Sequence, residues 1–129
     1  MTIDYAERAR ALVGTRFRPQ GRSALGLDCV GVAVATYGLP AADVRRDYRI
    51  RGDHAAEVRE ALGAHFRRVA ARHIRPGDLM VMRIARDQIH LAVRTLKGFV
   101  HAHARLRGVV ETPGLPEWPL LGAYRRRKH

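Results

Sequence analysis

The chemistry available to this sequence centres on a single cysteine. Cys29 is the only cysteine among 129 residues, so the chain can form no internal disulfide and no multi-cysteine zinc site. It lies within the segment GLDCVG, residues 26–31, directly ahead of an apolar run that we predict to be a buried helix. The unpaired N–H groups and the dipole of a helix N-terminus stabilise a thiolate. Cys29 is therefore a candidate nucleophile, with Asp28 as the N-cap residue that holds the turn.

A thiol nucleophile needs a base, and a histidine on a neighbouring element is the usual supplier. His90 lies early in a predicted strand, 89–95, and His101 lies in the next predicted strand, 99–104. A tight turn at Lys97-Gly98 joins these strands, so the two rings can meet across the ladder. The base in turn needs an orienting partner. His90 is thus the candidate base and His101 its candidate partner.

Two other interpretations of the same residues remain open. A single cysteine in an apolar helix is often a small hydrophobic core residue. His101 and His103 share one strand face, and His90 could complete the three-histidine donor set of a zinc site, which would leave Cys29 in the core. The remaining histidines lie on predicted helix surfaces, in loops or at the chain end and receive no role: His54, His65, His73 and His129.

Composition limits the class of protein. Hydrophobic residues make up 47% of the chain, enough for a core, and its length fits a single domain over 1–129. Lys and Arg number 24 against 12 acidic residues, which gives a net charge of +12. Such a charge suits a polyanion, either nucleic acid or a bacterial cell wall. Because the arginines are dispersed and only 6% of residues are aromatic, a nucleic-acid partner is not expected.

Membrane and export signals are absent from the sequence. No apolar run approaches the ~20 residues that span a bilayer. The N-terminal segment, MTIDYAERARALVG, carries acidic residues and a helical pattern where a secretory signal has a basic start and an apolar block. We therefore expect cytoplasmic synthesis without a signal peptide, and no membrane partner.

The spacing of apolar residues changes from a period of 3.6 to a period of 2 after the turn at 75–78. Before the turn, the pattern predicts helices over 4–13 and 29–37, and a third that begins at Asp53 with an apolar side formed by Ala56, Val58, Leu62 and Phe66. After it, alternation predicts strands over 79–82, 89–95, 99–104, 108–111 and 120–125. Helices followed by an antiparallel meander predict an α+β fold, with N-terminal helices packed on an antiparallel β-sheet.

Several segments, in order along the chain, resemble one known family. They are GTRF at 14–17, GLDCVG at 26–31, PGDL at 76–79, HLAV at 90–93 and FVHA at 99–102. Together they resemble the NlpC-type bacterial cell-wall cysteine peptidases, which are papain-like enzymes of minimal size. The last part, GVVET at 108–112 followed by Trp118 and a basic strand, resembles the branch associated with phage tails and gene-transfer particles.

This resemblance implies a minimal papain-like fold with Cys29 as nucleophile, His90 as general base and His101 as the residue that orients it. The implied reaction is hydrolysis, without a metal or other cofactor, of an amide in peptidoglycan stem peptides, typically between D-glutamate and diaminopimelate. Phage-tail proteins are then possible partners. Acyl transfer or deamidation by the same triad, and a non-hydrolytic tail or wall-binding module with the same fold, remain alternatives.

The chain departs from the family pattern in the loop before the nucleophile. Phe17 stands twelve residues ahead of Cys29, where many members have Tyr, and Gln20-Gly21 replaces a usual Gly pair. Val30 follows the cysteine where Ser is usual. We therefore treat Phe17, Gln20 and Asp28 as candidates for an oxyanion or substrate loop.

Overall fold

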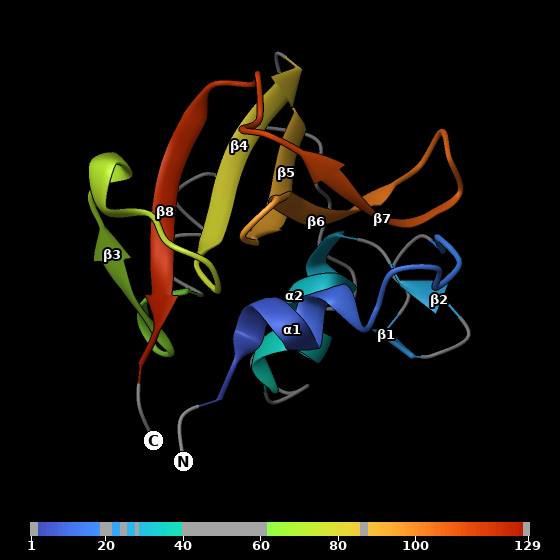
Figure 1. Ribbon diagram of the computed structural model, residues 1–129, viewed down its shortest axis with the longest axis horizontal. Helices are drawn as coiled ribbons and strands as arrows, with labels where there is room; N and C mark the ends of the chain where they lie inside the picture. Colours follow the sequence, from blue (N-terminus) through green and yellow to red (C-terminus); the bar gives the residue numbers. More distant parts are fainter. Residues whose placement is uncertain are drawn as a thin grey trace.

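A computed structural model describes residues 3–18, 22–23, 26–27, 29–39, 62–85 and 88–127. Two helices lie beside an antiparallel sheet (Figure 1). The helices are α1 (Tyr5–Arg10) and α2 (Cys29–Tyr37). The strands of the six-stranded sheet are β3 (Phe66–Val69), β4 (Leu79–Ala85), β5 (Gln88–Arg94), β6 (Gly98–His103), β7 (Gly108–Pro113) and β8 (Leu120–Arg126). A separate small hairpin pairs β1 (Arg22–Ser23) with β2 (Gly26–Leu27), and a 3-10 turn covers Ala71–His73. No helix in the described part of the chain is long and apolar enough to cross a bilayer.

The strands are ordered β3-β8-β4-β5-β6-β7, and each neighbouring pair is antiparallel. Strands β4 to β7 form the predicted meander. Strand β8 then returns across the sheet and pairs with β4, where Val81 lies opposite Gly122. The β5–β6 ladder is short: within the described residues it covers only Val93 opposite Val100 and Arg94 opposite Phe99, next to the hairpin turn.

Local sequence explains why the two helices form where they do. The Asp4 carboxylate accepts a hydrogen bond from the Glu7 backbone N–H at 3.0 Å, which caps the start of α1. The chain turns away soon after α1 at Gly14, whose φ of +96° favours glycine. Helix α2 differs in being apolar on nearly every side, and most of its residues are buried. Its stability therefore comes from the core around it.

The central strands of the sheet, β4 to β6, are buried on both faces, and alternation along β5 divides its residues between the two faces. Ile89, Leu91 and Val93 belong to the main core, which also contains Cys29 and much of α2. Ala92 belongs to a smaller apolar cluster with Met80, Met82 and Phe99, against which Trp118 packs. Burial on both faces explains the nearly continuous apolar character of β4, which alternation alone does not predict.

The predicted α+β fold is confirmed, including the helix that begins at Cys29 and the five predicted strands. The assignment of Phe66 to a helix is wrong: it begins β3, where it lies opposite Arg126 of β8. Its ring is buried and packs edge-on against Tyr37, with centroids 4.9 Å apart. Pairing with a strand 60 residues later in the chain overrides the local helical pattern. Residues 53–61 of that predicted helix lie outside the described residues.

Gly98 provides a test of the β6–β7 packing. A Cβ atom at this position would overlap the carbonyl oxygen of Thr112 and lie 2.8 Å from the Cα of Pro113. Because both obstacles are backbone atoms of the paired strand, Gly98→Ala is expected to lower the free energy of unfolding by about 3 kcal/mol in urea denaturation. Gly63→Ala is the control, since a Cβ there meets nothing within 4 Å. Equal unfolding midpoints for the two variants would contradict the packing described.

Candidate active site

Cys29 is the first residue of α2, and its side chain is 3% exposed. The helix packs against β5 and β6, the strands that carry the two candidate histidines. Cys29 shares the main core with Ile89 and Leu91, the residues on either side of His90. The structure thus confirms the expected position of the thiol, at the beginning of a buried helix that rests on the histidine-bearing hairpin.

His90 and His101 are in direct contact. His90 Nε2 lies 2.8 Å from His101 Nδ1, and the ring planes cross at 82°. His101 Nε2 lies in turn 2.8 Å from the hydroxyl oxygen of Thr112 on β7. Three side chains from three adjacent strands therefore form one hydrogen-bonded chain. The prediction that the two rings meet across the hairpin is confirmed.

The proton positions in this chain follow one of two orders. In the first, His90 Nε2–H donates to His101 Nδ1, and His101 Nε2–H donates to Thr112 Oγ1. In the second, both donations run in the opposite direction, from the Thr112 hydroxyl towards His90. Either order occupies both nitrogens of His101 but only Nε2 of His90. The nitrogen available for proton transfer is therefore His90 Nδ1 only.

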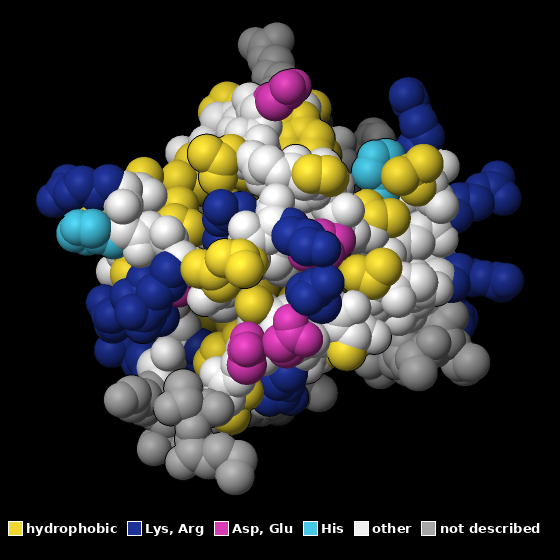
Figure 2. All heavy atoms as spheres, in the orientation of Figure 1, with side chains coloured by type: hydrophobic (Ala, Val, Ile, Leu, Met, Phe, Trp, Pro, Cys, Tyr) yellow, Lys and Arg dark blue, Asp and Glu magenta, His cyan; other side chains and the backbone are white. Residues whose placement is uncertain are grey.

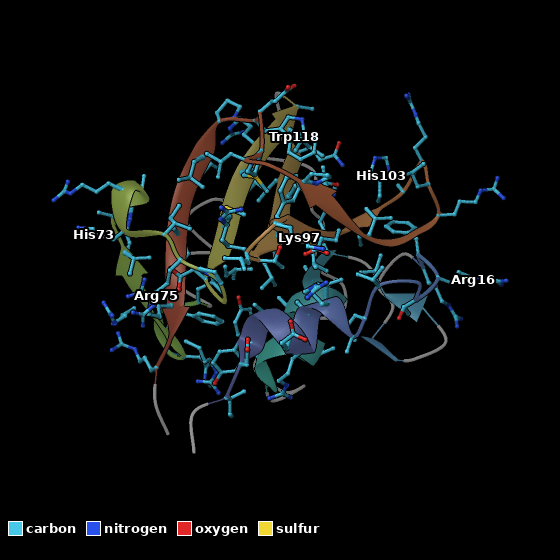
Figure 3. The ribbon with its side chains drawn as sticks, in the orientation of Figure 1. Arg16, His73, Arg75, Lys97, His103 and Trp118 are labelled. Atoms are coloured by element: carbon cyan, nitrogen blue, oxygen red, sulfur yellow. The ribbon has the colours of Figure 1, made fainter. Side chains whose placement is uncertain are left out.

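Aromatic side chains surround the histidine pair. Trp118 contacts both rings edge-on, with centroids 5.7 Å from His90 and 6.1 Å from His101. Phe99 packs against His101 at 4.7 Å between ring centroids. Figure 3 shows Trp118 at the end of the sheet remote from the helices. These contacts place the histidine rings on the Trp118 side of their strands, whereas Cys29 approaches from the α2 side.

The β5–β6 ladder is too short to reach the two histidines, whose strands lie between the α2 side and the Trp118 side of the sheet. Among the described residues, its last pair is Val93 opposite Val100, so neither His90 nor His101 lies within it. At the level of the histidines, the described residues of β5 and β6 form no ladder hydrogen bonds, so the two strands are not paired where the rings lie. Helix α2 packs onto the same two strands.

Burial controls the charge of the histidine pair. It lowers the pKa of His90 from 6.5 to about 3, with smaller contributions from His101 and His103. It lowers the pKa of His101 to about 4, with His103 as the second cause. Both imidazoles are therefore neutral at neutral pH, and His90 has a lone pair that can accept a proton.

These lowered pKa values make the stability of the fold depend on pH. Below pH 6.5 the unfolded chain binds protons at both rings, whereas the folded chain excludes them. The stability that the two neutral rings contribute to the folded protein is therefore fully present above pH 6.5 and is lost as pH falls towards the pKa values of the folded state. When the pH is lowered from near 7 to near 4.5, each ring is expected to lower the free energy of unfolding by about 2–3 kcal/mol. Urea denaturation at both pH values measures the loss. His101→Gln should remove its share of the pH dependence, and an unchanged pH dependence in this variant would contradict the account.

The geometry does not favour the three-histidine metal site. No group of three or more His, Cys, Asp or Glu side chains within the described residues is arranged to hold a metal ion. Both ring nitrogens of His101 already face hydrogen-bond partners. His103 Nδ1 accepts a hydrogen bond from the Leu106 backbone N–H at 3.2 Å. A metal ion would have to replace these bonds, so the histidines fit a proton-transfer chain better.

The candidate loop residues are placed only in part. Phe17 is half-buried and packs against the main core, and its backbone N–H donates to the Arg107 carbonyl oxygen at 2.9 Å. Its ring thus has a packing role. Gln20 and Asp28 lie outside the described residues, so their roles remain predictions.

Sequence reasoning missed Thr112. His101 pairs with Val110, and Thr112 lies two residues further along β7, on the same face as Val110 and diagonal to His101. A hydroxyl residue at this alternate position was the available signal. That signal could be interpreted only once the β6–β7 register was known, because the register decides which residues are diagonal neighbours. Side chains of such neighbours are close enough to touch.

Structural comparison identifies the fold as that of the NlpC/P60 proteins. NlpC1 from Trichomonas vaginalis matches with a TM-score of 0.70 and 17% identity over 96% of this chain and 44% of that chain. An NlpC/P60 family protein from Bacillus cereus ATCC 10987 matches at 0.66 and 22%, over 95% and 39%. The NlpC/p60 domain of the peptidoglycan hydrolase SagA matches at 0.61 and 17%, over 85% and 86%.

The chain spans less than half the length of the T. vaginalis and B. cereus proteins. No protein-family model and no curated protein matches the sequence. The likeness is thus one of fold, that of papain-like NlpC/P60 domains, and function has to be argued from the site.

Proposed function

We propose that this chain is a cysteine peptidase that hydrolyses amide bonds in peptidoglycan stem peptides, of the D-glutamyl–diaminopimelate type. The observation that carries the proposal is the hydrogen-bonded chain His90–His101–Thr112, on strands against which a helix beginning with the only cysteine packs. A neutral imidazole with one free nitrogen, oriented by a second polar residue, is what a thiol nucleophile requires. The substrate class is supported by the name of SagA as a peptidoglycan hydrolase.

In the proposed reaction, His90 Nδ1 takes the proton of the Cys29 thiol as the sulfur attacks the amide carbonyl carbon. The proposal requires the thiol and the imidazole to meet beyond the end of the β5–β6 ladder, whose last described pair is Val93 opposite Val100. The backbone N–H of Cys29, at the helix start, donates to the oxygen that becomes negative. The negative charge that develops on the carbonyl oxygen compensates the positive charge on His90, a buried ring that would otherwise stay neutral.

The amine then leaves with the proton from His90 Nδ1, and a thioester remains on Cys29 as the C–N bond breaks. His90 next takes a proton from water, whose oxygen attacks the thioester carbon. Cleavage of the C–S bond returns the thiol and releases the carboxylic acid. In both half-reactions His90 acts first as base and then as acid.

His101 and Thr112 act as positioning residues in this scheme. When His90 is protonated, its Nε2–H donates to His101 Nδ1, so His101 must carry its own proton on Nε2. That proton can go to the Thr112 hydroxyl oxygen, 2.8 Å away. Thr112 therefore selects the tautomer of His101 that stabilises the imidazolium of His90.

Thr112→Val tests this role, since it keeps the side-chain shape and removes only the hydroxyl. We expect kcat to fall about tenfold with little change in KM, because a partner lost to a buried group costs about 1–3 kcal/mol. Thr112→Ser should restore most of kcat. The assay is the initial rate of muropeptide cleavage. Wild-type kcat in the valine variant would exclude Thr112 from the relay.

The phage-tail setting is a finer part of the proposal. It is supported by the resemblance of residues 108–112, Trp118 and the basic last strand to the tail-associated branch. The same setting would take a protein made in the cytoplasm to the wall of a target cell. Mass-spectrometric detection of this chain in purified tail-like particles from the producing cells is expected; its absence from such particles would exclude this setting.

Digestion of purified muropeptides tests the activity and separates it from the alternatives. Hydrolysis yields two fragments whose masses sum to the substrate plus water. Deamidation leaves one product, and acyl transfer adds an amine-bearing fragment. Intact muropeptides that nevertheless bind the protein would indicate the non-hydrolytic wall-binding module. We expect the hydrolytic pair of fragments, formed by the wild type and not by Cys29→Ala.

A further inference from the structure

We infer a second binding site, for a phosphodiester chain, in an arginine-lined hollow at the β3 edge of the sheet. The hollow has a volume of about 490 Å³. Its basic lining residues, which we call the arginine pocket, are Arg67, Arg68, His73, Arg75 and Arg125. Figure 2 shows Lys and Arg side chains gathered on the side where β3 lies, and Figure 3 labels His73 and Arg75 there.

The arginine pocket contains an unfavourable pairing of like charges. Arg67 of β3 lies directly opposite Arg125 of β8 in the ladder. Like charges at directly opposed positions destabilise a sheet. The Asp78 carboxylate offsets the charge of Arg125, so the charge of this pair that an anion would still neutralise is that of Arg67.

Among the described residues, only the Arg125 guanidinium of the pocket is paired with a carboxylate. Arg125 donates through Nε and Nη2 to the two oxygens of the buried Asp78, each at 2.8 Å, and also to the His73 carbonyl oxygen at 3.0 Å. This bidentate pair fixes Arg125 as a rigid wall of the pocket. Because Asp78 is engaged by Arg125, it does not pair with the other arginines of the pocket, which are therefore available to a ligand.

The other three arginines of the pocket have no carboxylate partner in the part of the chain that the structure describes. Arg68 Nη2 donates to the backbone oxygen of Leu121, at 3.4 Å, which supplies no charge. The Arg67 and Arg75 guanidinium groups have no acceptor among the described residues, and both residues are exposed. Two uncommitted guanidinium groups at one hollow form the donor pattern that binds phosphate oxygens in pairs.

The lining also indicates which kind of phosphate compound fits. The described residues that line the hollow include no Phe, Tyr or Trp, the large rings on which bases usually stack: besides the basic residues they are Val69 and Ala70. Proteins that bind single-stranded nucleic acid combine basic grooves with such stacking residues. A volume of about 490 Å³ exceeds the needs of one inorganic anion. We therefore favour a chain of phosphodiesters without bases.

The arginine pocket is separate from the histidine chain. Strand β3 lies three positions from β5 in the sheet, a distance of about 14 Å at ~4.8 Å between strands. Occupation of the pocket therefore requires neither the thiol nor the histidines. Binding can be measured in a Cys29→Ala protein, so the result stands apart from the proposed peptidase activity.

The test is calorimetric titration of the Cys29→Ala protein with a synthetic poly(glycerol phosphate) oligomer. The pocket variant is Arg67→Gln/Arg75→Gln, and the matched control is Arg16→Gln/Arg105→Gln, which removes the same charge from exposed positions at the β7 side. We expect the pocket variant to weaken binding about tenfold or more, and the control to change it by less than about twofold. Circular dichroism verifies that both variants are folded.

Three results would overturn the inference. The first is absence of binding by the unaltered pocket. The second is an equal loss of affinity in both double variants, which would indicate non-specific attraction by the net charge of +12. The third is tighter binding of a single-stranded oligonucleotide with the same number of phosphates, lost in the pocket variant, which would make the pocket a nucleic-acid site.

Discussion

Replacement of Cys29 by alanine is expected to lower kcat for stem-peptide cleavage by about 10⁴-fold or more. The reason is that the proposed reaction forms a bond to sulfur, and no other thiol exists in the chain to replace it. Alanine fits the space at the start of α2, so the loss should lie in chemistry and not in folding. The measurement is the initial rate of muropeptide cleavage, followed by chromatography and mass spectrometry.

The control for Cys29→Ala is its thermal unfolding midpoint. Cys29 is 3% exposed in the main core, so removal of its sulfur should cost only about 1 kcal/mol and leave a cooperative transition. Wild-type muropeptide binding by the variant would show that the substrate site is intact. Retained cleavage at more than a few per cent of the wild-type rate would exclude Cys29 as the nucleophile.

Loss of His90 should be nearly as severe. His90→Ala removes the nitrogen that takes the thiol proton and returns it to the leaving amine, so kcat should again fall by about 10⁴-fold. Because thiol and imidazole act as one unit, the double variant with Cys29→Ala should be no slower than either single variant. An additive double variant would show that the two groups act independently.

The neighbouring histidines provide graded controls for His90. His101→Asn should retain more activity than His101→Ala, because an amide can still accept from His90 Nε2. His103→Ala should be close to wild type, since His103 Nδ1 bonds the Leu106 backbone and lies outside the chain from His90 to Thr112. A His103→Ala variant as slow as His90→Ala would revive the metal-site interpretation.

The parts of the fold that sequence could predict are those with local causes. The helix from Cys29 to Tyr37 follows from an apolar run between a capping position and Gly38, whose φ of +63° ends it. The hairpin of β5 and β6 follows from alternation on either side of Lys97-Gly98. That turn also brings the two strands side by side, so the contact between His90 and His101 could be predicted from the amino-acid sequence alone.

The parts that sequence could not predict depend on pairing between distant segments. Nothing near Phe66 indicates a strand; its partner Arg126 lies at the other end of the chain. The return of β8 to β4, in place of continuing the meander beyond β7, leaves no local signal either. Thr112 joins the histidine chain only through the β6–β7 register.

The pKa values illustrate the same division. Residue type alone gives histidine an ordinary pKa of 6.5, whereas burial in the folded protein lowers the pKa of His90 to about 3. This burial arises from the Trp118 contact and the paired strands, which come from separate parts of the chain. The sequence therefore indicated His90 as the candidate base, but the charge state of His90 could be inferred only from the folded structure.

The most direct test of the central claim is the rate of Cys29 alkylation by iodoacetamide as a function of pH, in the wild type and in His90→Ala. If the neutral His90 takes the thiol proton as the sulfur attacks, the wild-type thiol should react well below the ordinary thiol pKa of ~8.5. In His90→Ala the reactivity should appear only above that value. Superimposable pH profiles for the two proteins would contradict a functional Cys29–His90 pair.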